Sequence, residues 1–90
     1  MINADLPGAD LIATGLDDLC HGARTVEGLL VAIGAPRLRQ LGYDVPATDP
    51  NPEHALYALL ADMNPVTAHG RYNALVRRLV SFERAAACAR

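Results

Sequence analysis

Four arginines near the C-terminus are the residues whose type and spacing best fit a binding chemistry. A guanidinium group presents a planar fork of donors that matches phosphate oxygens, so a row of arginines on one helix predicts contact with a nucleic-acid backbone. The four candidate phosphate-binding residues are Arg71, Arg77, Arg78 and Arg84. We expect them on the last helix, opposite its apolar seam.

The charge distribution gives these arginines a second interpretation. Residues 1–65 contain nine acids and three arginines, a net charge of −6, whereas residues 66–90 have a net charge of +4. A compact fold can neutralise this difference internally, because opposite charges in a small domain lie within about a Debye length of each other. The chain as a whole has a net charge of −2 and no motif that reads nucleic acid, so internal neutralisation is the favoured interpretation. We expect a facing arginine near Asp17 and Asp18, or near Glu53 or Asp62.

The cysteines and histidines do not have the spacing of a catalytic or metal site. A zinc site takes about four ligands, usually in short C-x₂₋₄-C or H-x₃₋₅-H spacings, and none occurs here. His21, His54 and His69 are all expected at helix ends, and Cys20 and Cys88 are expected to be reduced, buried thiols. We therefore predict no catalytic residue, no cofactor and no metal. An enzyme that uses Cys20 or a histidine is the most distant alternative.

The elements that position these residues are predicted to be helices. Apolar residues recur at spacings of three and four, and no stretch alternates with period two, so the fold class is all-α. Thr25, Asn51 and Asn64 are predicted N-caps, the asparagines because a proline follows each of them. We expect one domain over residues 1–90, an orthogonal or bundle-like arrangement of four or five helices. The expected helices span 8 or 9 to 21, 25–33, 37–41, 52–63, and from 65 or 69 to the C-terminal region.

Two glycines inside the first two predicted helices indicate how those helices pack. Gly15 and Gly28 each cost about 1 kcal/mol of helix stability relative to alanine, so a close approach between the two helices is expected there. On helix 52–63, the apolar spacing predicts a buried face made of Leu56, Leu59, Leu60 and Met63.

The apolar seam of the last helix predicts self-association. Hydrophobic residues make up 51% of the chain, more than a 90-residue domain can bury alone, and a two-fold dimer is the usual way to cover the excess. The sequence thus favours a small non-enzymatic protein-interaction module, a homodimer or a binder of another protein. The alternative is a nucleic-acid-associated regulator that uses the arginines. The expected interface residues are Tyr72, Leu75, Val76, Leu79, Val80 and Phe82.

Composition excludes two further classes of protein. The apolar content and small net charge exclude a disordered tail, and no window reaches the roughly 18 apolar residues of a membrane span. Residues 1–5 carry no basic segment of a signal peptide, so we expect a cytoplasmic protein without membrane partners. All eight basic residues are arginine, and alanine and leucine are abundant, which indicates a GC-rich bacterial genome.

Overall fold

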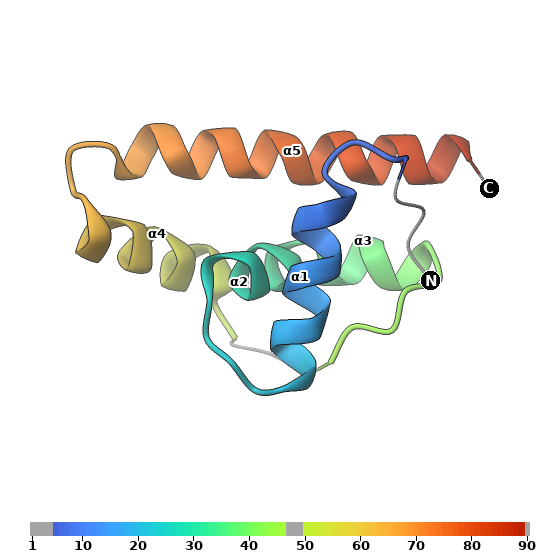
Figure 1. The fold of residues 1–90 in the computed structure, drawn as a ribbon, viewed down its shortest axis with the longest axis horizontal. Coiled ribbons are helices and arrows are strands. Elements are labelled where there is room, and N and C mark those ends of the chain that lie inside the picture. Colours follow the sequence, from blue (N-terminus) through green and yellow to red (C-terminus); the bar gives the residue numbers. More distant parts are fainter. Residues whose placement is uncertain (1–4, 47–49, 90) are drawn as a thin grey trace.

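The fold consists of helices joined by short connections (Figure 1). The computed structural model describes residues 5–46 and 50–89. Within those residues there are five helices and no strand, which confirms the all-α prediction. The helices are α1 (Ala9–Cys20), α2 (Val26–Ile33), α3 (Ala35–Gln40), α4 (Pro52–Met63) and α5 (Ala68–Cys88).

Side-chain caps fix the starts of α2 and α4 as predicted. The Thr25 hydroxyl accepts a hydrogen bond from the Gly28 N–H at 3.0 Å. The Asn51 carboxamide oxygen accepts one from the His54 N–H at 3.3 Å. Each bond satisfies a backbone donor that has no partner within its helix.

Asn64 has a different role from Asn51, although a proline follows both. Its side-chain oxygen accepts a hydrogen bond from the Val66 N–H at 3.0 Å, which stabilises a turn between α4 and α5. Helix α5 then begins at Ala68, so the later of the two expected starting points is the correct one. The prediction that Asn64 caps a helix beginning at Pro65 is wrong, because the bond it makes is that of a local turn.

Helix α5 lies along the long axis of the molecule and the shorter helices lie on one side of it (Figure 1). The overall dimensions are 38 × 24 × 18 Å. At 1.5 Å per residue, the 21 residues of α5 extend over about 32 Å, nearly the full length of the domain. Helix α1 crosses in front of this layer at a steep angle, and α4 and α3 lie beneath opposite ends of α5 (Figure 1).

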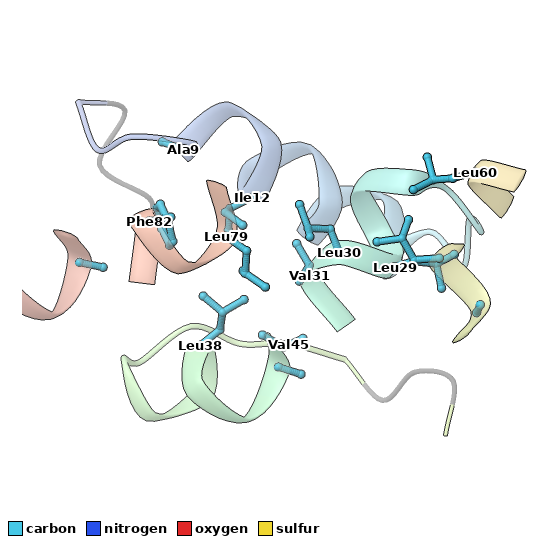
Figure 2. Packing of buried hydrophobic residues seen from close by; sticks show 14 of the residues in the cluster. Ala9, Ile12, Leu29, Leu30, Val31, Leu38, Val45, Leu60, Leu79 and Phe82 are labelled. Atoms are coloured by element: carbon cyan, nitrogen blue, oxygen red, sulfur yellow. The ribbon is translucent and has the colours of Figure 1, made fainter. Parts of the chain in front are cut away.

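One hydrophobic core joins all five helices (Figure 2). Phe82 from α5, Ile12 from α1 and Leu38 from α3 are all fully buried. No polar or charged residue is buried among the described residues, so the core needs no internal hydrogen bonds between side chains. The largest fully buried side chains are Phe82, Ile12, Leu30, Leu38, Leu56, Leu60 and Val31.

Helices α1 and α2 approach each other closely at Gly15, as its position in the sequence predicts. A Cβ atom at Gly15 would overlap the carbonyl oxygen of Glu27 and a methyl group of Val31, and would lie 2.9 Å from the Glu27 carbonyl carbon. Only glycine leaves room for that backbone. At Gly28 an added Cβ would lie 3.6 Å from the Asp18 Cβ, an ordinary contact distance, so Gly15 is the residue that sets this crossing.

Candidate interaction surfaces

The four arginines of α5 form two rows and not one. With about 100° of rotation per residue, Arg71 and Arg78 share one direction, and Arg77 and Arg84 share another about 120° away. Arg78 lies beside α1, where its guanidinium is 3.4 Å from the Asp10 carboxylate. Both of these side chains are more than half exposed, so the pair contributes little to stability. We call Arg77 and Arg84 the outer arginine row.

The expected internal neutralisation is small. Arg71, Arg77 and Arg84 make no hydrogen bond or ion pair with the part of the chain that the structure describes, and Arg78 pairs with an acid that the sequence did not single out. The four acids that were expected to face an arginine of α5 do not do so. Instead, Asp17 lies 3.6 Å from the His21 ring nitrogen, and Asp18 accepts a 2.6 Å hydrogen bond from the Thr25 hydroxyl. Most of the positive charge of α5 is therefore not paired with the acids of residues 1–65 that the structure describes.

The apolar seam of α5 is largely used within the chain itself. Leu79 and Phe82 are buried in the core, so as folded they present no surface to a partner. Tyr72 and Leu75 are half-buried and pack against the core. Val76 and Val80 are also half-buried. Of the six expected interface residues, these last four retain exposed area.

The largest exposed apolar side chains lie where α4 meets α5. Among the described residues, the exposed large hydrophobics are Tyr57 (40% exposed), Met63 (58%) and Val66 (90%). All three lie on α4 or on its connection to α5. We call this region, with Tyr72 of α5, the hairpin end. Met63 was expected in the core, and that prediction is wrong. The residues of α4 that are buried are Ala55, Leu56 and Leu60, whereas Met63 lies at the exposed end of the helix.

Aromatic rings connect the two helices of the hairpin end. The Tyr57 ring lies 5.7 Å from the Tyr72 ring and 6.4 Å from the His69 ring, both in tilted geometry. The His69 Nε2 atom is 3.1 Å from the Asn73 amide nitrogen. Tilted pairs at these distances are favourable, so the rings hold α4 against α5 while Tyr57 stays partly in solvent. The sequence places Tyr57 one position beyond Leu56, but its pairing with α5 depends on the tertiary fold.

Both cysteines are exposed free thiols, which corrects the prediction that they are buried. Cys20 lies in the last turn of α1, and its side chain lines an open hollow of about 560 Å³ between α1 and the segment after α3. Cys88 lies in the last turn of α5. Thiol nucleophiles are activated by basic or cationic neighbours, whereas the charged side chains that line the hollow are carboxylates. The lining residues are Ala13, Leu16, Asp17, Cys20, Gly42, Tyr43 and Asp44.

The histidines lie at or near helix ends, as predicted. The His21 Nδ1 atom is 2.8 Å from the Asp17 carbonyl oxygen at the end of α1, where a protonated ring also suits the helix dipole. His54 and His69 lie in the first turns of α4 and α5. Across the described residues, no three histidine, cysteine or acidic side chains are grouped as metal ligands would be.

Glu83 is an electrostatic feature that the sequence did not indicate. An added Cβ on Gly34 would lie 3.0 Å from a carboxylate oxygen of Glu83, which places this acid over the junction of α2 and α3. Burial raises the pKa of the Glu83 carboxyl, and the nearby Arg37 partly lowers it again. The burial could be anticipated only from the packing of α5 on this junction.

No helix in the described ranges combines the length and the hydrophobicity that crossing a membrane requires. No family model, curated protein or solved structure matches the chain.

Proposed function

We propose that this chain is a small non-enzymatic interaction module that self-associates through α5 and the adjoining hairpin end. The observation that carries the proposal is that the large exposed hydrophobics of the described residues, Tyr57, Met63 and Val66, all lie on α4 and its connection to α5. Scattered exposed hydrophobics are normal on a soluble protein, but large ones concentrated at a single place indicate a contact surface.

The half-buried residues of α5 extend this surface along the helix. Tyr72 contacts Tyr57, and Val76 and Val80 follow at helical spacing on the same side of α5. Leu75 contributes only at the margin of the core. Leu79 and Phe82 support the surface from beneath, because they fix α5 to the rest of the fold.

A second copy of the chain is the simplest occupant of this surface. A two-fold contact places the same patch on both subunits, so each hairpin end covers the other. Tyr57 and Tyr72 suit such a contact, since tyrosine supplies a large apolar area and keeps a polar group for the rim.

The test is the solution mass of a variant in which the hairpin end carries charge. Met63→Glu combined with Val66→Asp places two carboxylates in exposed positions, so the fold should be retained. We expect the parent to sediment at twice the 9.6 kDa chain mass and the variant as a monomer. Chain concentrations up to about 1 mM should be used, because a standard free energy of about −4 kcal/mol then suffices for half-association.

The matched control adds the same charge elsewhere on α5. Ala74→Glu with Ser81→Asp changes two exposed residues on the side of α5 away from Val76 and Val80, and should leave the dimer intact. A parent that is monomeric at about 1 mM, or a hairpin-end variant with unchanged mass, would contradict the proposal.

The outer arginine row supports nucleic-acid binding as a second candidate. Arg77 and Arg84 are exposed and have no partner among the described residues, so they are available to phosphates. Duplex binding should be measured by fluorescence anisotropy at about 0.15 M salt, where surface charges are screened beyond about 8 Å. We expect no binding. Micromolar binding that Arg77→Gln with Arg84→Gln abolishes, and Arg71→Gln with Arg78→Gln does not, would instead establish the second candidate.

A further inference from the structure

The hollow beside Cys20 is formed by parts of the fold that are held in place. Its α1 wall contains Leu16, the neighbour of Gly15, where α1 is locked against α2. Its other wall contains Tyr43, whose ring lies 5.7 Å from the buried ring of Phe82. Both walls are therefore anchored in the core, and the hollow exists before any ligand arrives. Its volume of about 560 Å³ is within the range of small-molecule sites.

The charged side chains that line the hollow are both acids. Asp17 comes from the last turns of α1 and Asp44 from the segment after α3. The carbonyl end of α1 adds partial negative charge at the same side. Asp44 has no hydrogen bond or ion pair with any described residue, and Asp17 has only the exposed His21 at 3.6 Å.

The nearest arginine in sequence does not neutralise these acids by direct contact. The Arg39 guanidinium donates to the carbonyl oxygens of Val45 at 2.9 Å and Pro46 at 3.1 Å. It is therefore bound to the backbone of the loop and not to Asp44. The hollow thus combines apolar lining residues, Ala13, Leu16 and Tyr43, with two carboxylates. Of these, Asp17 is paired only with the exposed His21, and Asp44 has no partner among the described residues.

We infer that this hollow binds a small organic cation, an amine or guanidinium attached to an apolar body. The body covers Leu16 and Tyr43, and the cationic group lies toward Asp17 and Asp44. Both parts contribute, because an anion would be repelled by the carboxylates and a neutral apolar molecule would gain no charge interaction with them. A bare metal ion is a poorer occupant, since the described residues provide no group of three ligands.

Phenethylamine and its neutral analogue 2-phenylethanol form the matched pair of probes. Titration of the ¹⁵N-labelled chain should shift the amide signals of Leu16, Cys20, Gly42 and Tyr43 with phenethylamine, at millimolar concentrations. We expect 2-phenylethanol to bind about tenfold more weakly, as two exposed charge interactions of about 0.7 kcal/mol each would produce. Equal binding of the two probes, or shifts located elsewhere on the molecule, would overturn the inference.

Variants locate the charge that is responsible. Asp17→Asn with Asp44→Asn should weaken phenethylamine binding about tenfold and leave 2-phenylethanol unchanged. Asp62→Asn, at an exposed acid of α4, is the control and should have no effect. If the double variant binds phenethylamine as tightly as the control, the carboxylates do not recognise the cation and the inference is wrong. The result is independent of self-association, because the hairpin end contributes no residue to the hollow.

Discussion

Helices α2 and α5 differ in how many of their residues are buried in the core. Five of the eight residues of α2 are buried, whereas only Ala68, Leu79, Phe82 and Ala86 are buried among the 21 residues of α5. Helix α2 is consequently a core element with little surface of its own. Helix α5 closes the core with a few residues and presents most of its length to solvent.

The contacts of the two helices differ in the same way. Helix α2 meets α1 backbone to backbone at Gly15, a contact that tolerates no added atom. Helix α5 meets α4 through the rings of Tyr57 and Tyr72, which can adjust to a neighbour. Interaction surfaces are therefore expected on α4 and α5, where the contacts are adjustable and the side chains exposed.

The largest effect is expected where α5 enters the core. Leu79→Asp places a carboxylate among buried apolar groups without a partner, at a cost of several kcal/mol, comparable with the stability of a small domain. We expect the variant to lose its cooperative thermal transition in circular dichroism. Ser81→Asp, two residues away on the exposed side, should melt close to the parent. If Leu79→Asp melts at the same temperature as the parent, the Leu79 side chain of α5 is not buried in the core.

A substitution at the α1–α2 contact should have the next largest effect. Gly15→Ala forces α1 away from α2, and overpacking of this kind costs about 1–3 kcal/mol, more than the roughly 1 kcal/mol that alanine gains in a helix. Urea denaturation should show a lower midpoint with an unchanged slope. A midpoint at or above that of the parent would show that α1 and α2 can separate freely.

The same substitution on α5 should have the opposite sign. An alanine Cβ at Gly70 would meet nothing within 4 Å, and Gly70 lies inside α5 with no left-handed backbone to lose. We expect Gly70→Ala to stabilise the domain by about 0.5–1 kcal/mol, an increase of a few degrees in Tm. A loss of stability for Gly15→Ala and a gain for Gly70→Ala would confirm that the α1–α2 contact is tight and that the surface of α5 at Gly70 is open. A decrease in Tm would show that the added methyl group at position 70 clashes with a neighbouring atom.

The smallest effect concerns Glu83, the partly buried acid of α5. Because burial raises its pKa above the unfolded value of about 4.5, the folded chain binds the proton more tightly than the unfolded chain. The stability from this group is thus fully present below about pH 4.5 and is lost as the pH rises through the folded pKa. We expect Glu83→Gln to be more stable than the parent at pH 7, by less than about 1 kcal/mol, with the difference vanishing at acid pH.

Thermal melts of the parent and Glu83→Gln across pH 3.5–7.5 would measure that difference, because other titrating groups cancel in the comparison. A variant less stable than the parent at pH 7 would show that attraction to Arg37 outweighs the effect of burial.

Local signals in the sequence located the helices well. The Asn51 cap and the apolar spacing gave α4 its observed limits, and Thr25 marked the start of α2. These signals act over three or four residues, so they do not depend on the rest of the fold. The division of the α5 arginines into two rows can also be predicted from the sequence, because a rotation of about 100° per residue points Arg71 and Arg77 in different directions.

Exposure and the hollow depend on which elements pack together, and sequence reasoning could not reach them. Met63 has the spacing of a buried residue, but it is the last residue of α4 and is 58% exposed. Cys20 is apolar enough for a core and yet faces a gap between α1 and Tyr43. That gap brings together residues more than 20 positions apart, and no local pattern indicates such a pairing.

The position of α5 also has a consequence for how the chain folds. Arg78 meets Asp10 across 68 residues, and the Phe82 ring packs against Tyr43, so α5 contributes contacts that are distant in sequence. Helices α1 and α2 are separated by only five residues, Cys20 to Val26, and can pair after closing a short loop. The α1–α2 pair, and α4 with the start of α5, are therefore expected to form early. The contacts of α5 with Asp10 and Tyr43 form later, because they close the longest loops. Before those contacts form, Leu38 and Ile12 lack Phe82 and Leu79 as core neighbours, and the exposed apolar surface favours aggregation.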